Sequence, residues 1–424
     1  MKTSKKLPLI MIISMLVLSS IPSGVQALKI YGYYGFAFTE GNDQEYVLVY
    51  KKDVVETDIV QNREIYSRRV YKTPTEFRTE YEEDDVKISQ LEFEIEDHNY
   101  FIMNSSLVKH NEVVYLMVAA RDLTTNKLAI FATYTEDNGN SWQKFSTETE
   151  TGTLDYTCIL TSDISYTSFY CFDSVVFQGN ITFVYTFRDG IRVNSTIVSF
   201  DPTNLEAKMA DEQLDEDEYT SKDAEYMGLD FDLYEHEGRI YVVYSDVRRK
   251  HIKFTYLKED GVNLAEATII EPPVGDTNIL NPSIVFWNEG FYIIGQDKHS
   301  TIVEQAMLFE IHRWGVWIEE VGSDSPIVIS KIGKALHDGF YEQKSLLSTY
   351  KDNLIAVYER GDSSLGGGLP DIGFFFSDDG EQWTTKYLGE MSLFTNLGFI
   401  FFVATIGVFI VVLPSYIFIK KSKK

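Results

Sequence analysis

The sequence predicts an all-β protein, folded as one β-propeller of about six blades, with a special apolar segment at each end of the chain. Two observations predict the propeller. Runs of aromatic and β-branched residues recur in sets of four and are separated by short polar turns. One turn sequence also recurs with a period of roughly 60 residues, and an internal repeat of this kind indicates a modular fold.

The recurring turn is clearest at residues 135–142, which read TEDNGNSW, and at residues 377–383, which read SDDGEQW. Each copy follows a β-rich run and contains Ser or Thr, then Asp, Gly and Trp at similar spacing. The Asp carboxylate can accept hydrogen bonds from the N–H groups of the turn, the Gly can adopt a positive φ, and the Trp can cover the apolar face of the hairpin. We therefore assign a structural role to Thr135, Asp137, Gly139, Trp142, Ser377, Asp379, Gly380 and Trp383.

Two weaker copies lie between these turns. Asp201 takes the Asp position of a copy at residues 199–205, and Asp260 with Gly261 belongs to a copy at residues 258–264. The four Asp residues are separated by 64, 59 and 119 positions. Because the last interval is about twice the others, the sequence predicts a decayed copy near residues 313–317.

The two ends of the chain predict export and a membrane anchor. Residues 1–27 begin with lysines, continue with an apolar run and end in small residues, which is typical of a secretory signal peptide. Residues 397–419 are mostly Leu, Ile, Val and Phe, are long enough to span a bilayer and are followed by lysines, which the positive-inside rule places in the cytoplasm. The predicted organisation is a signal peptide at 1–27, a cell-surface propeller at 28–391, a transmembrane helix at 392–419 and a cytoplasmic tail at 420–424.

Within the propeller, four strands are predicted first at residues 29–38, 45–52, 64–73 and 86–96. Each later set begins with a small polar or acidic residue, and a polar turn and a strongly apolar second strand follow it. These initial residues are Ser106, Ser174, Asp232, Ser283 and Ser345. No helical pattern or linker interrupts the series, so we expect one domain.

Both cysteines of the chain, Cys158 and Cys171, lie in residues 143–171, the longest stretch without a strand pattern. In an exported domain two cysteines are more often joined than reduced. The sequence therefore predicts a Cys158–Cys171 disulfide that closes an irregular loop.

The charge balance limits the partners. The chain has 64 acidic residues against 38 Lys and Arg, and seven of the lysines lie in the two end segments. Such an acidic propeller disfavours nucleic acid and anionic lipid as partners. The acidic run at 211–232 is predicted to be a solvated loop because its spacing is not that of an EF-hand. Calcium there is the alternative, and no other metal or cofactor is predicted.

Propeller topology also predicts where a ligand would bind. If the strands of a blade are lettered A to D from the centre outwards, the recurring turns are C–D turns, and the B–C loops lie on the opposite face. Charged residues end the B strands and border the central depression there, although each alone could form an ordinary surface ion pair. The candidate ligand-binding residues are Arg121, Arg188, Arg248, Arg360 and, at the start of an inner strand, Lys344.

The recurring turn resembles the Asp-box, or bacterial neuraminidase repeat, of the sialidase superfamily, and the likeness covers most of residues 101–391. In that family three arginines hold the sialic acid carboxylate and a tyrosine acts as the nucleophile. Here Met103, Asn104 and Ser105 occupy the positions before Ser106 where the first arginine is expected, and Lys344 stands at the tyrosine position. The resemblance therefore implies a sialidase-like propeller whose catalytic positions are lost.

These observations favour a cell-surface module that binds an extracellular glycan or an exported protein without cleaving it. The alternative is a glycoside hydrolase that uses two carboxylates, with Asp122, Asp338 and Glu359 as the candidates. A purely structural spacer is a third interpretation. Two carboxyl groups roughly 5 to 10 Å apart at the mouth of a concave pocket would favour the hydrolase, and a flat, crowded face would favour the spacer.

Overall fold

The computed structural model describes residues 30–387 with internal gaps. The gaps are residues 43–44, 57–58, 73–76, 80–84, 96, 146–155, 166–168, 190–191, 213–229, 246–250, 259–263, 272–277, 304–305, 323–326, 338–344, 351 and 361–370. The described residues form strands and the turns between them, and they contain no helix able to cross a membrane. The predicted signal peptide at 1–27, transmembrane helix at 392–419 and tail at 420–424 lie outside them.

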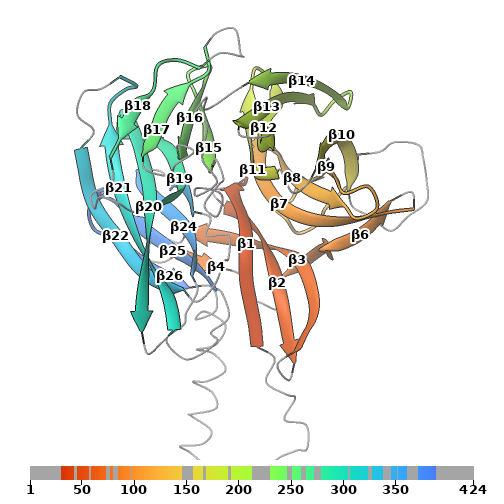
Figure 1. Ribbon diagram of the computed structural model, residues 1–424, viewed down its shortest axis with the longest axis horizontal. Helices are drawn as coiled ribbons and strands as arrows, with labels where there is room; N and C mark the ends of the chain where they lie inside the picture. Colours follow the sequence, from red (N-terminus) through yellow and green to blue (C-terminus); the bar gives the residue numbers. More distant parts are fainter. Residues whose placement is uncertain are drawn as a thin grey trace, which may run out of the picture.

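Six antiparallel sheets surround a common centre, which confirms the predicted all-β propeller of six blades (Figure 1). Blade 1 contains β1 (Ile30–Glu40), β2 (Glu45–Glu56), β3 (Ile59–Lys72), β4 (Phe77–Thr79) and β5 (Val86–Gln90). Blade 2 contains β6 (Glu92–Ile95), β7 (His98–His110), β8 (Val113–Asp122), β9 (Lys127–Thr135) and β10 (Thr157–Ser165). Blade 3 contains β11 (Phe169–Phe177), β12 (Asn180–Asp189), β13 (Arg192–Asp201) and β14 (Glu206–Glu212).

The remaining blades have four strands each. Blade 4 contains β15 (Phe231–His236), β16 (Arg239–Ser245), β17 (Ile252–Tyr256) and β18 (Thr268–Ile270). Blade 5 contains β19 (Asn278–Trp287), β20 (Gly290–Val303), β21 (Ala306–Ile318) and β22 (Ile327–His337). Blade 6 contains β23 (Ser345–Tyr350), β24 (Asn353–Arg360), β25 (Asp371–Ser377) and β26 (Thr384–Tyr387).

Within a blade, neighbouring strands pair in chain order from the centre outwards, and short strands are added to blades 1 and 2. The strands nearest the axis are β1, β7, β11, β15, β19 and β23, and each contacts those of the adjacent blades. Each of these strands leads into an A–B turn. Their C-terminal ends therefore meet on one face of the ring, the face that also carries the C–D turns.

The hydrophobic core consists of six clusters, one between each pair of adjacent blades. Successive side chains of a strand point to opposite faces of its sheet, so a blade packed on both sides needs strands that are apolar throughout. The strand β8 shows this, because every side chain from Val114 to Ala120 is buried. The near-continuous apolar second strands of the sequence are thus explained by blade stacking.

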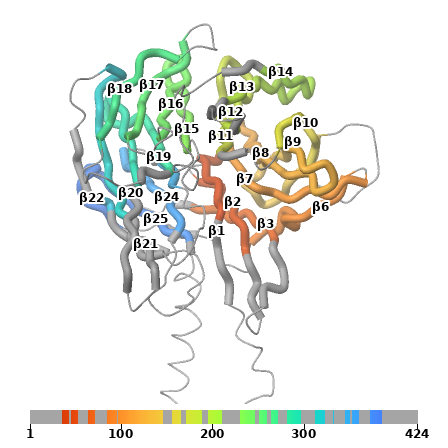
Figure 2. Tube along the Cα trace, viewed as in Figure 1, coloured from red at the N-terminus to blue at the C-terminus, as the bar shows by residue number. Residues whose placement is uncertain are grey.

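The ring closes between blade 6 and blade 1 through side-chain packing. Phe36, Phe38 and Tyr46 of blade 1 belong to one cluster with Val357 and Phe374 of blade 6. Each described sheet consists of consecutive strands, so none of the described strands is exchanged between the first and last blades. In Figure 2 the red trace of blade 1 and the blue trace of blade 6 lie next to each other.

The turn at 135–142 connects β9 to β10 as a C–D turn. The Asp137 carboxylate accepts hydrogen bonds from Thr135 Oγ1 at 2.7 Å and from the Ser141 N–H at 2.8 Å. Gly139 has a φ of 89°, which favours glycine. Burial alone would raise the pKa of Asp137, but these hydrogen bonds outweigh it and hold the pKa below its ordinary value.

The same turn also joins blade 2 to blade 1. Trp142 is half-buried, and its Nε1 donates to Ser67 Oγ of β3 at 2.9 Å. Ser67 Oγ in turn donates to the Gly139 carbonyl at 2.7 Å. The turn therefore stabilises an interface between blades in addition to its own hairpin.

The turn at 377–383 has a similar structure in blade 6. Asp379 accepts a hydrogen bond from Ser377 Oγ at 3.0 Å, and Gly380 has a φ of 74°. Tyr292 of blade 5 donates its hydroxyl to the Gly380 carbonyl at 2.9 Å and contacts the ring of Trp383. This turn, too, is attached to the blade before it.

The weaker copies are less complete. Asp201 ends β13 before a C–D turn, and its carboxylate accepts the Thr203 N–H at 2.8 Å. Asp260 and Gly261 lie outside the described residues. The decayed copy predicted near 313–317 is misplaced, because those residues lie within β21. The C–D turn of blade 5 follows Ile318, since Trp314 and Trp317 are strand residues that pack in the core rather than residues of a turn.

The predicted disulfide is wrong, because Cys158 and Cys171 are not joined. Cys158 lies in β10, the outer strand of blade 2, whereas Cys171 lies in β11, the innermost strand of blade 3. The stretch 143–171 is therefore not one irregular loop but includes strands of two blades. The predicted strand at 86–96 is likewise divided, into β5 of blade 1 and β6 of blade 2.

Candidate functional site

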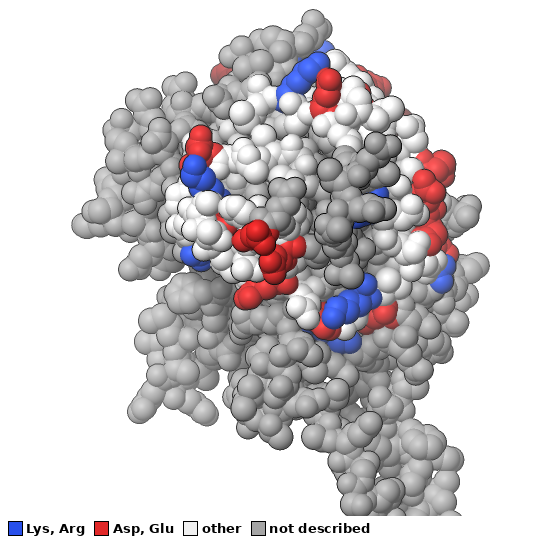
Figure 3. All heavy atoms as spheres, turned by 90° about the vertical axis from the view of Figure 1, so that its right-hand side faces the viewer, with Lys and Arg blue, Asp and Glu red and all other residues white. Residues whose placement is uncertain are grey.

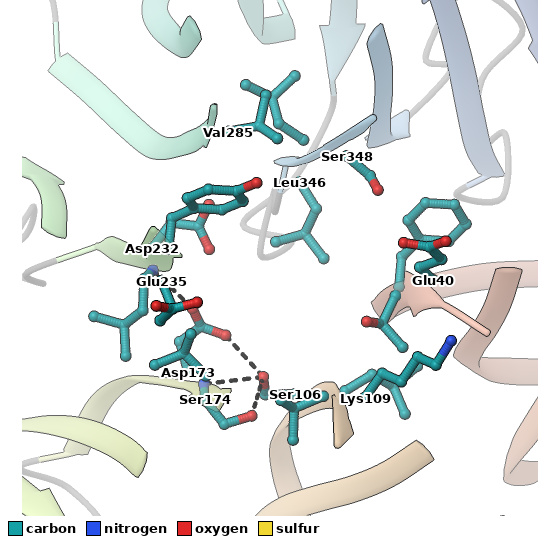
Figure 4. Close-up of a pocket in the computed structure, with 18 of the residues that line it drawn as sticks. Glu40, Ser106, Lys109, Asp173, Ser174, Asp232, Glu235, Val285, Leu346 and Ser348 are labelled. Atoms are coloured by element: carbon teal, nitrogen blue, oxygen red, sulfur yellow. Dashed lines mark hydrogen bonds between the residues drawn. The ribbon is translucent and has the colours of Figure 1, made fainter. Parts of the chain in front are cut away.

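A cavity of about 440 Å³ lies at the centre of the propeller, where strands of all six blades converge (Figure 4). Its lining comes from the C-terminal halves of the innermost strands, such as residues 38–40 of β1 and 346–349 of β23. Its mouth is therefore on the face of the A–B and C–D turns. This is the face opposite the B–C loops, where the sequence predicted binding.

Hydrogen bonds between blades surround the deep end of this cavity. Ser174 Oγ of β11 donates to Ser106 Oγ of β7 at 2.8 Å, and Ser106 Oγ donates to Asp173 Oδ1 at 2.7 Å. Asp173 Oδ2 accepts the Leu233 N–H of β15 at 2.9 Å. Blades 2, 3 and 4 are therefore linked at the axis through side chains.

The chain of hydrogen bonds continues into blades 5 and 6. Asp232 Oδ2 accepts hydrogen bonds from Ser283 Oγ and from the Ile284 N–H of β19, the latter at 2.9 Å. Ser283 Oγ accepts the Leu347 N–H of β23 at 2.8 Å. Five of the six innermost strands thus take part in one polar arrangement at the centre of the ring.

Asp173 and Asp232 form a carboxyl pair at the centre of this arrangement. The two side chains are hydrogen-bonded to each other, and both residues are 7% exposed. Burial raises the pKa of Asp232 well above its ordinary value of 3.8, and the charge of Asp173 raises it further. Two carboxylates in contact cannot both ionise cheaply, which is the reason that the proximity of Asp173 favours the protonated form of Asp232.

The mouth of the cavity carries three charged side chains (Figure 4). Glu40 ends β1, while Lys109 and Glu235 lie one residue before the ends of β7 and β15. Lys109 Nζ donates to the Gly41 carbonyl at 2.7 Å, and Glu235 Oε1 accepts the Gly238 N–H at 2.8 Å. These hydrogen bonds fix the Lys109 ammonium and one Glu235 oxygen at the rim.

Among the hydrolase candidates, Asp122 is held by the turn after β8. Its carboxylate accepts hydrogen bonds from the Thr124 N–H at 2.7 Å and from Thr125 Oγ1 at 2.6 Å, and it contacts His98 Nδ1 at 2.9 Å. Burial alone would raise the pKa of Asp122, but these hydrogen bonds outweigh it and lower the pKa to about 2. Such a carboxylate is poorly suited to accept a proton near neutral pH.

Glu359 lies in β24 and is 1% exposed. Its Oε2 is 3.4 Å from the Gly35 N–H of blade 1, and its carbonyl accepts a hydrogen bond from Arg313 Nη2 of blade 5 at 2.9 Å. Neither Glu359 nor Asp122 lines the central cavity. The third candidate, Asp338, lies outside the described residues.

The predicted ligand-binding residues are not part of the cavity either. Arg121, Arg188 and Arg360 lie at or next to the ends of the B strands β8, β12 and β24, which is the opposite end of the blades from the cavity mouth. Arg248 and Lys344 lie outside the described residues. The described part of the structure therefore brings together a different set of residues from the predicted one.

The sequence does contain a signal for the residues at the centre. Ser106, Ser174, Asp232, Ser283 and Ser345 are the residues with which successive repeats begin. The hydrogen bonds among the described members of this region join residues 51 to 68 positions apart. A single recurring polar position marks the register of each repeat, but only closure of the ring shows that these positions meet.

On the outer surface, charge is less concentrated. Among the described residues of the face shown in Figure 3, acidic and basic side chains form small separate groups between uncharged residues. No group of three or more His, Cys, Asp or Glu within the described ranges could hold a metal ion. The central cavity is thus the candidate site that the described geometry supports best.

No protein-family model and no curated protein sequence matches the chain. Among solved structures, it is similar to a sialidase of Trypanosoma rangeli at 11% identity and a TM-score of 0.46, over 87% of this chain and 56% of that one. It is also similar to the six-bladed fucose-recognising lectin of Aleuria aurantia, at 11% identity, a TM-score of 0.43 and coverages of 84% and 94%. A family 117 glycoside hydrolase of Zobellia galactanivorans gives 11% identity, a TM-score of 0.43 and coverages of 70% and 87%. Similarity at this level assigns no activity to the chain.

Proposed function

We propose that this chain is a cell-surface propeller that binds an extracellular glycan in its central cavity without cleaving it. The cavity itself is the main support, because about 440 Å³ is within the range of pockets that enclose small ligands. A space of this size suits one or two sugar rings better than the broad surface of an exported protein. Hydroxyl and carboxyl groups in the lining provide partners for sugar hydroxyls.

The contact between the two deep carboxyl groups favours binding over hydrolysis. Glycosidases need roughly 5 to 10 Å between their two carboxyl groups, so that a sugar carbon or a water molecule lies between them. Asp173 and Asp232 are instead hydrogen-bonded to each other and to the strands around them. This pair is therefore better suited to holding the blades and a ligand than to acid–base catalysis.

Export and anchoring are part of the same proposal. The N-terminal pattern of residues 1–27 and the apolar run at 397–419 support a propeller displayed outside the cell. The sialidase-like turns fit this location, and the missing tyrosine and arginine positions fit a protein that binds a sugar without cleaving it.

A glycan array and a panel of aryl glycosides test the proposal together. We expect the chain to bind at least one glycan and to release no aryl alcohol above a heat-inactivated control. Ser348→Trp, in the cavity wall, should abolish binding, whereas Glu266→Trp, on an exposed segment, should not. Absence of binding to every glycan would reject the proposal. Turnover that disappears in Glu359→Gln or Asp122→Asn would establish the hydrolase instead.

A further inference from the structure

Carboxyl groups outnumber cationic groups in the lining of the central cavity. Glu40, Asp173, Asp232 and Glu235 are the lining residues with carboxyl groups, and Lys109 is the lining residue with an ammonium. Glu40 and Glu235 at the mouth already outnumber the ammonium of Lys109, whatever the protonation of Asp173 and Asp232. Like charges at short range repel, so this cavity disfavours an acidic sugar such as sialic acid.

Some hydrogen-bond donors of the cavity wall are directed at acceptors of the wall itself. Ser106 Oγ donates to Asp173, Ser174 Oγ donates to Ser106, and Lys109 Nζ donates to the Gly41 carbonyl. The carboxylate oxygens, in contrast, are acceptors that can each take two hydrogen bonds. A ligand that brings hydrogen-bond donors therefore fits the carboxylates of this lining.

The lining also favours an organic cation over a bare metal ion. The described residues hold no cluster of His, Cys, Asp or Glu with the spacing of a metal site. Tyr234, which is half-buried in the wall, instead provides an aromatic surface next to the acidic mouth. Burial and the charges of Glu235 and Glu40 raise the pKa of Tyr234, although a hydrogen bond with the Phe286 backbone lowers it. Glu235 is next to Tyr234 in β15, whereas Glu40 lies on the opposite side of the cavity (Figure 4). An aromatic ring beside carboxylates suits an ammonium attached to a ring with an apolar face.

We propose that the ligand of the central cavity is a sugar with a free ammonium group, such as a 2-amino sugar, and that Glu235 receives the ammonium. The apolar strand residues between the polar ones, such as Leu107 and Leu346, contact the C–H face of the sugar ring. This inference rests on the proposed function, because it takes the central cavity as the glycan site. Beyond the proposed function, the inference specifies the charge of the ligand and names the carboxylate that selects it.

Calorimetric titration of the full-length chain in detergent micelles tests the inference. The two probes are the disaccharide of glucosamine and its N,N′-diacetyl counterpart, which differ in the two amine groups and their charge. We expect the free amine to bind at least tenfold more tightly at low salt, and the difference to shrink as salt is added.

A matched pair of variants assigns the preference to the mouth of the cavity. Glu235→Gln removes one lining carboxylate but keeps an oxygen that can accept the Gly238 N–H. Glu237→Gln removes the same charge on the adjacent turn, where the side chain is exposed and does not line the cavity. We expect the first variant to weaken amine binding at least fivefold and the second to leave it unchanged. Equal melting temperatures would show that both variants are folded.

The outcomes separate this inference from the proposed function. Equal or tighter binding of the acetylated disaccharide, or binding only of neutral or acidic glycans in the array, would overturn the ammonium inference and leave the glycan-binding function intact. Equal loss of amine binding in both variants would also overturn it, because long-range charge would then explain the preference. If neither disaccharide and no glycan of the array binds, the proposed function itself fails.

Discussion

The carboxyl pair at the axis joins strands of different blades through its hydrogen bonds. A buried aspartate is stable when it is neutral or well hydrogen-bonded, and a second aspartate in contact with it can remain charged only if the first keeps its proton. Asp173 and Asp232 meet this condition with donors from Ser106, Ser283 and two strand N–H groups. The pair should therefore stabilise the ring at low pH and weaken it at high pH.

The change Asp232→Asn tests this at the level of one residue. The folded-state pKa of Asp232 is raised above 3.8, so its contribution to stability is complete below that pH and is lost as the pH rises through the folded-state pKa. An asparagine amide can donate to Asp173 at any pH. At pH 8 we expect Asp232→Asn to unfold at a higher urea concentration than the parent. The free energy of unfolding should be larger by about 1 kcal/mol or more. The stability advantage of the variant should be much smaller at pH 4.5, and an advantage equal at both pH values would contradict the raised pKa of Asp232.

Asp122 should behave in the opposite way. Its folded-state pKa of about 2 lies below the ordinary value of 3.8, so its contribution is present above the ordinary value and is lost as the pH falls toward 2. Asp122→Ala removes the acceptor of the turn after β8 and should destabilise the protein by about 1 to 3 kcal/mol at pH 7. Thermal unfolding at pH 7 and pH 2.5 measures this. The difference from the parent should narrow at the lower pH, while glycan binding by the folded variant should be unchanged.

At the level of elements, the recurring turns act between blades as well as within them. Trp142 both packs against the core between blades 1 and 2 and donates to Ser67. Because the side chain is half-buried, we expect Trp142→Ala to destabilise the protein by about 2 kcal/mol. This is less than the loss expected when a fully buried tryptophan is replaced by alanine. Trp142→Phe keeps most of the packing and should cost about 1 kcal/mol for the lost hydrogen bond. Denaturant unfolding measures the loss of stability in both variants. Equal losses for Trp142→Ala and Trp142→Phe would show that the packing of the ring contributes nothing to stability.

The positions of the cysteines lead to a chemical prediction. Cys158 is exposed on β10, and Cys171 is partly buried on the innermost strand of the next blade. We expect mass spectrometry of the protein, alkylated without prior reduction, to find both thiols modified, with Cys158 reacting first. A reducing agent should leave the melting temperature unchanged. Recovery of a peptide cross-linked through Cys158 and Cys171 would show that the two strands can separate and re-pair.

The sequence predicts elements well where a strand is buried on both faces and poorly where it is not. The apolar run of β8 and the turn at 135–142 identify blade 2 without ambiguity, since few other structures need such a pattern. The outer strand β10 has mixed polar and apolar residues because much of it faces solvent, so its sequence resembles a loop. The tryptophans of β21 can be mistaken for part of the turn motif, because tryptophan occurs both in hydrophobic cores and on turns of this kind.

The candidate site could be predicted only in part for a related reason. Repeats show that Ser106, Asp232 and Ser283 occupy equivalent places, but hydrogen bonds across the ring depend on how closely the blades approach the axis. The arginines at the ends of the B strands look more like ligand-binding residues because charge at a loop is easy to see in a sequence. A polar side chain inside an apolar strand is less conspicuous, although its burial makes it more informative.

For the whole molecule, stability depends on six similar interfaces between blades, one of which closes the ring. Phe374 of blade 6 packs edge-on against Phe38 of blade 1 and is fully buried. We expect Phe374→Ala to destabilise by about 3 to 5 kcal/mol. Phe254→Ala, in the cluster of blades 4 and 5, is the matched change at an internal interface. Denaturant titrations followed by fluorescence and by circular dichroism should coincide for both variants if the ring unfolds as a unit.

The closure of the ring by non-covalent contacts alone also determines how the propeller would respond to force. The first described strand, β1, and the last, β26, belong to the two blades that meet at the closing interface. A load applied between the two ends of the domain would therefore pull these blades directly apart. Each internal interface is bypassed by a covalent link, but this one is held by side-chain contacts. Under tension, the propeller should open there first and then unwind blade by blade from its two ends.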